Sequence, residues 1–222
     1  IHAEVFLKGI EDIADEFADN ISNGIIDKEN LVYNLDQTLK FDHNISSIGA
    51  IFAPYSFDEN LRLYSPYFVK VGNNTKQYSF DSFYDYTTQS VPWFDESIES
   101  DDNWSLPFYD EISNKDYIYF TKRFTMPSAE GKDSTGLIFI GISIDDIKEK
   151  ISSLNIEYPG QPYLITNDGL YIIQPADSRI KTPERLKDIR MGESGFAKIN
   201  DKATNDTIYQ FFTPLKYSEW II

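Results

Sequence analysis

Apolar residues in the N-terminal part of the chain recur at intervals of three and four positions. Between Val5 and Ile25 the repeating positions are Phe6, Ile10, Ile13, Phe17, Ile21 and Ile25, and acidic residues occupy many of the positions between them. This spacing places the apolar side chains on one face of an α-helix. A second stripe of Leu31, Leu35 and Leu39 predicts another helix from about Lys28 to Phe41.

From Ser47 onwards the pattern changes to short apolar runs that are separated by polar turns. Strands are predicted at 47–54 and 62–71, which form a hairpin, and at 116–126 and 135–144. The stretch 72–77 is predicted as a loop, and 81–97 as short helical pieces with Pro92 in a first turn. A helix at 145–154, capped by Asp145, is expected to end this module.

A similar order of elements then follows in the C-terminal part of the chain. The segment 162–175 is predicted as a hairpin around an Asn-Asp-Gly turn, with a short helix at 182–189 and strands within 195–200, 206–215 and 219–222. We therefore predict an α+β protein in which a long N-terminal helix precedes two tandem antiparallel-sheet modules. The predicted domains are stalk helices at 1–45, a first module at 46–154 and a second module at 155–222.

Composition narrows the class of protein. A formal net charge of −16 without a lysine or arginine stripe argues against binding to nucleic acid or to anionic lipid. A hydrophobic content of 41% indicates a folded chain, and the longest apolar run, 137–144, is too short to cross a bilayer. The chain begins at Ile1 without an initiator methionine and ends in the strand-like sequence WII, so we expect it to be part of a longer protein.

Few residues point to catalysis or to a metal. There is no cysteine and only 2 histidines, no glycine-rich phosphate loop occurs, and the sequence GESGF departs from a nucleophile elbow at Phe196. The acid pairs Asp95/Glu96 and Asp101/Asp102 could serve glycoside hydrolysis, and 101–103 and 200–206 carry calcium-type ligands without EF-hand spacing. We predict solvated acids, no catalytic residue, no metal and no cofactor, and we attribute the Asn-x-Ser/Thr triplets to composition.

Aromatic residues cluster between Tyr84 and Tyr109 on backbone that Pro92 and Pro107 interrupt, so they cannot form one helical stripe. Rings with a polar tip on irregular backbone are typical of a small-molecule pocket, although the same rings could simply complete the core. The predicted pocket residues of this stretch are Tyr84, Tyr86, Trp93, Phe94, Trp104 and Tyr109. On the strand at 116–126, alternation places Tyr117, Tyr119, Thr121 and Arg123 on one face. If that face lines the pocket, Arg123 could hold an anion; otherwise it is an exposed arginine.

The sequences IGAIFAPYSFDENLRLYSPYF, YDYTTQSVPWF, WSLPFYD, GLIFIGISIDDI, YLITNDGLYIIQP and TPLKYSEWII together resemble the double Cache (dCache) sensor domains. The resemblance implies two tandem PAS-like modules, the first distal to the membrane and ligand-binding, the second proximal. It also implies an extracytoplasmic sensor domain of a membrane-anchored receptor. A sensor histidine kinase is the first expectation, with no enzymatic activity in this part. The apolar stripe of the N-terminal helix could form a homodimer with the same helix of a second copy, or it could pack onto the sheets of its own chain.

The amino-acid-binding members of that family carry a tyrosine, an arginine five positions later, x-Trp-Tyr, a further tyrosine and an aspartate. Tyr86, Trp93 and Tyr109 occupy matching positions here, but Val91 replaces the arginine, Phe94 the tyrosine and Gly141 the aspartate. Without the bidentate arginine and the aspartate, a pocket has no preference for a zwitterion. We therefore expect a carboxylate or a polyol as the ligand and disfavour an amino acid.

Two other functions fit the same residues. A secreted carbohydrate-binding or hydrolytic protein would also use aromatic platforms and acid pairs, and an ectodomain could bind a periplasmic partner protein instead of a small molecule.

Overall fold

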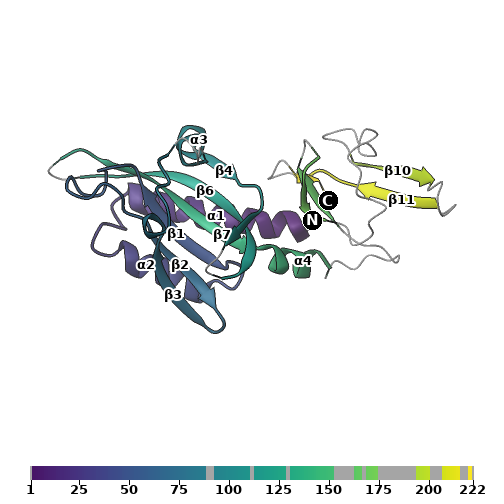
Figure 1. Cartoon of the computed structure of the whole chain (residues 1–222), viewed down its shortest axis with the longest axis horizontal. Helices are drawn as coiled ribbons and strands as arrows, with labels where there is room; N and C mark the ends of the chain where they lie inside the picture. Colours follow the sequence, from purple (N-terminus) through teal and green to yellow (C-terminus); the bar gives the residue numbers. More distant parts are fainter. Residues whose placement is uncertain are drawn as a thin grey trace. The chain divides into compact units, whose positions relative to one another are not determined.

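The computed structural model describes residues 2–88, 93–110, 113–128, 131–152, 163–166, 169–174, 194–200, 207–215 and 220–221. The chain forms two compact units, one of Lys8–Ser143 and one of Ile1–Leu7 with Ile144–Ile222 (Figure 1). The predicted α+β class is confirmed, because helices and antiparallel sheets both contribute to the fold.

The two predicted N-terminal helices are present as α1 (His2–Ser22) and α2 (Leu31–Phe41). On α1 the buried face includes Ile10, Phe17 and Ile21, and on α2 all three leucines of the stripe are fully buried. Ile25 was expected on the first stripe, but it is 64% exposed. The helix ends before it, and Gly24 adopts a positive φ of 70° that turns the chain away.

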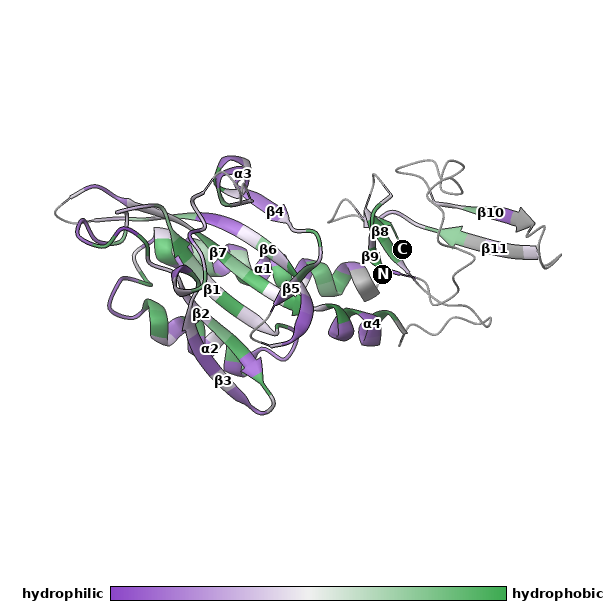
Figure 2. Ribbon diagram, viewed as in Figure 1, coloured by the Kyte–Doolittle hydropathy of each residue, from purple (hydrophilic) through white to green (hydrophobic). Residues whose placement is uncertain are grey.

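A seven-stranded antiparallel sheet forms the centre of the unit Lys8–Ser143. Its strands are β1 (Ser47–Phe52), β2 (Pro66–Val71), β3 (Asn74–Ser79), β4 (Asp102–Trp104), β5 (Phe108–Asp110), β6 (Lys115–Met126) and β7 (Ser134–Ser143). The order is β3-β2-β1-β7-β6-β4, and β5 also pairs with β6. The central strands β1 and β7 are almost wholly buried and hydrophobic, whereas the edge strand β3 is largely hydrophilic (Figure 2).

Three of these strands differ from the prediction. A loop was predicted at the position of β3, because its polar sequence does not alternate with apolar residues. All six residues of β3 nevertheless pair with β2. The turn between the two strands contains Gly72, whose φ is 61°. The strands β4 and β5 have three residues each and contain Trp104 and Tyr109 of the aromatic stretch, where no strand was predicted. The helical pieces predicted at 81–97 are present as the 3₁₀ turn η1 (Phe80–Ser82) and the helix α3 (Trp93–Ser100), and Pro92 lies outside the described residues.

The unit of Ile1–Leu7 with Ile144–Ile222 holds the helix α4 (Ile144–Ser152) and two small sheets. Because α4 begins at Ile144, Asp145 lies in its first turn and is not the predicted cap. One sheet has the order β12-β8-β9, from Trp220–Ile221, Leu164–Thr166 and Tyr171–Ile173, and β10 (Gly195–Asn200) pairs with β11 (Thr207–Phe212). The helix predicted at 182–189 lies outside the described residues. Across the described ranges, no helix combines the length and the apolar character that a bilayer crossing requires.

Candidate functional site

A cavity of about 910 Å³ lies over one face of the seven-stranded sheet. Three groups of residues surround it: side chains of the sheet itself, the aromatic segment around η1, and the stretch from α3 to β5. The lining consists of Ile51, Tyr67, Tyr119, Thr121 and Phe139 from the sheet, Phe80, Phe83 and Tyr84 around η1, Trp93, Glu96 and Ser97 on α3, and Asn103–Asp110.

The floor of the cavity is a row of residues that the strand register brings together. Tyr67 on β2 and Phe139 on β7 both lie opposite Gly49 of β1, and Thr121 of β6 lies opposite Phe139. A methyl group at Gly49 would lie 2.5 Å from Cε1 of Phe139 and 2.8 Å from the Pro66 carbonyl oxygen. Only glycine therefore leaves room for the Phe139 ring over this position.

The next row repeats this arrangement with Tyr119. Tyr119 on β6 lies opposite Gly141 on β7, where an added methyl group would come within 2.6 Å of the Tyr119 ring. The Tyr119 hydroxyl is 3.4 Å from the hydroxyl of Tyr67. Burial raises the pKa of both tyrosines well above the usual value, so both side chains remain neutral at physiological pH. Tyr67 and Tyr119 therefore add no charge to the lining of the cavity.

The walls are aromatic rings that pack edge to face. Phe80 contacts Tyr84 and Trp93 with ring centroids 5.6 Å and 6.3 Å apart. Burial raises the pKa of Tyr84 to about 12. Trp104 is also a lining residue, but its ring packs against Phe120, whose side chain points to the other face of β6 from Tyr119 and Thr121, with centroids 5.1 Å apart. The contacts of Phe80 fix the orientation of the rings in this wall.

Two carboxylates belong to the lining. Asp110 is buried, and its Oδ2 atom accepts hydrogen bonds from the backbone nitrogen and the hydroxyl of Ser113, at 3.1 Å and 2.6 Å. Glu96 is exposed on α3. No lysine, arginine or histidine is present among the described lining residues, so the formal charge of the site is negative.

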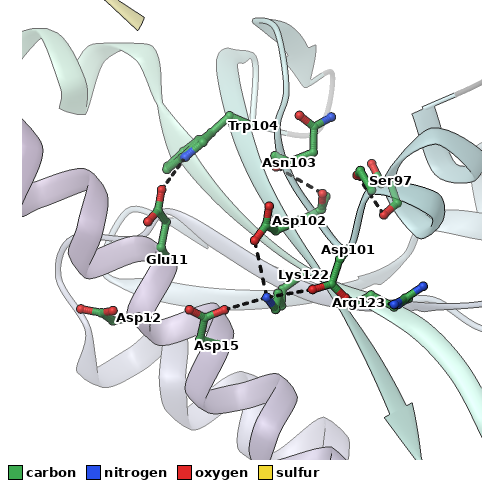
Figure 3. A network of polar contacts seen from close by, with 12 residues as sticks. Glu11, Asp12, Asp15, Ser97, Asp101, Asp102, Asn103, Trp104, Lys122 and Arg123 are labelled. Atoms are coloured by element: carbon green, nitrogen blue, oxygen red, sulfur yellow. Dashed lines mark hydrogen bonds and ion pairs between the residues drawn. The ribbon is translucent and has the colours of Figure 1, made fainter. Parts of the chain in front are cut away.

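A polar network joins this region to α1 (Figure 3). The indole nitrogen of Trp104 donates a hydrogen bond of 3.1 Å to Oε1 of Glu11 on α1. Burial raises the pKa of Glu11, and the indole hydrogen bond acts against that rise.

Lys122 of β6 forms the second part of the network. Its amino group lies 3.3 Å from Asp15 on α1, 3.3 Å from Asp101 and 3.5 Å from Asp102. Burial disfavours the charge of Lys122, but hydrogen bonds to Asp15 and Asp101 outweigh burial and raise its pKa. The acid pair that the sequence offered for calcium or hydrolysis is thus ion-paired with a lysine. Within the described ranges, no three acidic, histidine or cysteine side chains are grouped to hold a metal ion.

The structure brings together part of the predicted site. The predicted residues that line the cavity are Tyr84, Trp93, Trp104, Tyr109 and Tyr119. The others with described side chains lie in the core beneath or beside it: Tyr86, Phe94 and Tyr117 are buried with the floor residues, and Gly141 lies under Tyr119. Tyr86 donates its hydroxyl hydrogen to the Phe52 carbonyl, at 2.8 Å, inside the core. Val91 lies outside the described residues.

Arg123 does not line the cavity in the described structure. Its guanidinium is half exposed, lies 3.2 Å from an Asp101 oxygen and donates a hydrogen bond of 3.2 Å to the Ile98 carbonyl. As the alternation along β6 predicts, Tyr119 and Thr121 lie on the cavity face, but the carboxylate of Asp101 holds the Arg123 guanidinium at the end of the strand, outside the lining.

Several lining residues were missed by sequence reasoning. They are Ile51, Tyr67, Phe80, Phe83, Glu96, Ser97, Asn103, Ser105, Leu106, Pro107, Phe108, Asp110 and Phe139. Tyr67 and Phe139 are far apart in sequence and meet only through their common partner Gly49. Asp110 directly follows a predicted aromatic residue, so a search for buried acids beside the cluster could have found it.

A comparison with known protein families gives one match for this architecture. Residues 33–149 match the family model of the methyl-accepting chemotaxis protein-like first PDC sensor domain, a range that includes all of the described lining. A comparison with curated protein sequences gives no match.

Solved structures with low sequence identity share the fold. The extracellular domain of soHK1S-Z6, described as a histidine kinase, has a TM-score of 0.74 at 18% identity, covering 99% of this chain and 88% of its own. Methyl-accepting chemotaxis protein X has a TM-score of 0.71 at 14% identity, with 98% and 89% covered. The periplasmic sensory domain of the Campylobacter jejuni chemoreceptor Tlp1 has a TM-score of 0.67 at 12% identity, with 98% and 87% covered.

These findings confirm the predicted resemblance to receptor sensor domains and the predicted fold class. The fold is that of solved extracellular and periplasmic sensor domains, and the chain belongs to the methyl-accepting chemotaxis protein-like family of first PDC sensor domains.

Proposed function

We propose that the cavity over the seven-stranded sheet is the ligand site of this sensor domain. The observation that carries the proposal is a recess of about 910 Å³ whose walls are aromatic rings, located within the family-matched residues. Apolar walls with a few placed polar groups are typical of small-molecule sites. In this proposal the aromatic rings offer a ligand apolar contact area, and polar contacts with the tyrosine hydroxyls and the two carboxylates orient it.

Ligands in similar proteins support a small organic molecule. The ligand-binding domain of the Pseudomonas aeruginosa amino acid chemoreceptor PctC is in complex with GABA, with a TM-score of 0.58 to this chain. The sensory domain of the Campylobacter jejuni chemoreceptor Tlp3 has isoleucine bound, with a TM-score of 0.57. The disfavoured amino acid and the expected carboxylate or polyol stay predictions for this chain.

The path from the ligand to the rest of the receptor follows the network of Figure 3 in this proposal. Trp104 lines the cavity and donates its indole hydrogen to Glu11 on α1. Lys122, beside the cavity residue Thr121, is bound to Asp15 one turn further along the same helix. A ligand that prefers one position of Trp104 therefore favours one position of α1, provided that its affinity differs between the two.

For the output module we propose a sensor histidine kinase. Three similar structures are extracellular domains described as histidine kinases, with TM-scores of 0.74, 0.76 and 0.74. A chemoreceptor is the second candidate, favoured by the family model itself. The homodimer through the N-terminal helix remains a prediction, and cross-linking of the receptor in membranes through cysteines placed at exposed α1 positions would test it.

A ligand screen tests the proposed site directly. The chain is melted in the presence of a metabolite library, and a ligand at 100 times its Kd stabilises the folded state by about 2.7 kcal/mol. Two of the 3 tryptophans, Trp93 and Trp104, line the cavity, so we expect a hit to change tryptophan emission as well. Trp93→Ala removes a wall and should abolish the response.

The matched control is Tyr33→Ala, which removes an exposed ring from α2, a helix that contributes nothing to the cavity. It should keep the full response to the same compound. A ligand that stabilises Trp93→Ala as strongly as the unaltered chain would show that this cavity is not the site.

A further inference from the structure

We propose, on the basis of the ligand site proposed above, that the hydroxyls of Tyr67 and Tyr119 form a donor pair for one carbonyl oxygen of an uncharged ligand with an apolar body. Three features of the described residues support this ligand class: the weak hydrogen bonding of the two buried hydroxyls, the absence of charge on them, and the apolar rim of the cavity.

The two hydroxyl groups are buried but only weakly hydrogen-bonded. Tyr67 is 1% exposed and Tyr119 is 8% exposed, and both line the cavity. Their hydroxyl oxygens are 3.4 Å apart, which is longer than the about 2.5–3.0 Å of ordinary O–H···O hydrogen bonds. Ser47 is close enough to lower the pKa of Tyr67, but among the described residues its hydroxyl has no partner in hydrogen-bond geometry. Since buried polar groups normally have a partner at normal distance, this pair has donor capacity left for a ligand.

The spacing of the two hydroxyls suits one shared acceptor. An oxygen atom about 2.8 Å from both phenol oxygens completes a triangle on the 3.4 Å base. Each hydroxyl hydrogen rotates to suit its acceptor, so both hydrogens can point at the same atom. A carbonyl oxygen has two lone pairs and accepts both hydrogen bonds, whereas an ammonium group accepts neither.

The donors are uncharged, which favours an uncharged acceptor. Burial raises the pKa of both tyrosines, so both keep their protons. The described lining contains no lysine, arginine or histidine to form the charge-assisted hydrogen bonds that offset the burial of a carboxylate. Asp110 of the lining lies opposite Lys115 in the register of β5 with β6, so this acid does not require a cation from the ligand.

The rim of the cavity suits the apolar body of such a ligand. Four apolar or aromatic lining residues are about half exposed: Phe83, Leu106, Phe108 and Tyr109. The floor residues Tyr67, Tyr119 and Phe139 are buried. A ligand that places its carbonyl group at the hydroxyl pair can cover the rim side chains with its apolar part, which removes apolar surface from water.

Four probes of one shape separate charge from hydrogen bonding. Acetophenone carries a carbonyl group, α-methylstyrene replaces its oxygen with a CH₂ group, and benzoate and benzamidine carry a negative and a positive charge on the same phenyl frame. NMR titration of the isotope-labelled chain gives each Kd from the indole signals of Trp93 and Trp104, which line the cavity. We expect acetophenone to bind at least about tenfold more tightly than either charged probe.

Hydroxyl deletions identify the donors. Tyr119→Phe and Tyr67→Phe each remove one hydroxyl and keep the ring, and α-methylstyrene corrects for any change in apolar contact. The Kd of α-methylstyrene divided by that of acetophenone should fall about three- to tenfold in each variant. The matched control is Tyr78→Phe on β3, whose ring centroid is 6.5 Å from that of Tyr67 but which does not line the cavity. This control should leave the ratio unchanged, and a thermal melt of each variant confirms that it is folded.

Each contrary result has a defined meaning. If the ratio stays the same in both Tyr67→Phe and Tyr119→Phe, the hydroxyls are not the donors and the carbonyl proposal is wrong. It is also wrong if benzoate or benzamidine binds more tightly than acetophenone, or if none of the four probes binds at millimolar concentration. The ligand site itself fails only if a compound that binds the unaltered chain binds equally well to Trp93→Ala.

Discussion

The two faces of the seven-stranded sheet differ in chemistry. On one face the helix α2 packs against β1 and β2 through Leu31, Leu35 and Leu39, all fully buried. On the other face aromatic residues gather around a cavity. The leucines of the first face are enclosed as in a close-packed core, whereas the rings of the second face border a cavity of about 910 Å³. The sheet thus stabilises the domain with one face and carries the proposed ligand site on the other.

A single strand shows both functions. On β6 the side chains of Phe120 and Lys122 contact Trp104 and the α1 carboxylate of Asp15, while Tyr119 and Thr121 line the cavity. Because successive side chains point to opposite faces, a movement on the cavity side is one residue away from a contact on the helix side. Residues that contact the helix side and residues that line the cavity therefore alternate along the same strand.

Leu35→Ala should cause the largest change, and it should affect stability only. Removing a fully buried leucine on the helix face costs about 2–5 kcal/mol of unfolding free energy. Denaturant unfolding measures the loss, and titration of the folded variant should give an unchanged ligand affinity. Tyr33→Ala on the same helix, with an exposed ring, is the control and should change neither. A large loss of affinity in folded Leu35→Ala would show that the two faces are not separate.

Gly141→Ala should reduce both the stability of the domain and its ligand affinity, because the new methyl group lies at the floor of the cavity. The new methyl group meets the Tyr119 ring at 2.6 Å and also the Ser47 hydroxyl. We expect a loss of about 1–3 kcal/mol in stability and a weaker ligand affinity, as Tyr119 must shift. Gly9→Ala on α1, where nothing lies within 4 Å, is the control and should stabilise the helix by about 0.5–1 kcal/mol. Unchanged affinity in Gly141→Ala would remove Tyr119 from the site.

Trp104→Phe should break the link between the cavity and α1, and it should reduce stability less than the two preceding substitutions. The ring contact with Phe120 is largely kept, but the hydrogen bond to Glu11 is lost, which costs about 1–2 kcal/mol. In a double-mutant cycle with Glu11→Gln, the two changes should be non-additive. Hydrogen exchange should show that ligand no longer alters the protection of α1. Ligand-dependent protection that persists in this variant would mean that the signal takes another route.

The smallest expected effect is a pH dependence from Glu11. Burial raises its folded-state pKa above the unfolded value of about 4.3. Between these two values the folded protein binds more protons than the unfolded chain, so stability falls as the pH rises through this window. Relative to Glu11→Gln, the unaltered chain should lose stability from about pH 4 upwards in denaturant unfolding. Glu16→Gln, which keeps Glu11, should retain the slope, and a flat difference curve for Glu11→Gln would contradict the account.

Sequence reasoning predicted the elements with local signals. The stripes of α1 and α2 and the long strands β1, β6 and β7 have periodic patterns that their own residues determine. The strand β3 was missed because an edge strand with a polar sequence depends on its partner β2 for its conformation. The three-residue strands β4 and β5 are too short to show any period.

The same dependence on local patterns explains which residues of the candidate site were predicted and which were missed. The aromatic cluster between Tyr84 and Tyr109 was found because its members are near one another in sequence. Tyr67 and Phe139 were not found, since their proximity depends on the register of both strands with Gly49. Arg123 was predicted on the cavity side, but its ion pair with Asp101 arises from the path of the chain between α3 and β4, which periodicity does not describe.

A structure of the chain with its best-binding compound from the ligand screen tests the central claim most directly. The account predicts that the ligand lies over the sheet in contact with Trp93 and Tyr119, with the leucine stripe of α2 unchanged. A ligand bound elsewhere on the chain, with the aromatic cavity empty or filled by its own side chains, would contradict it.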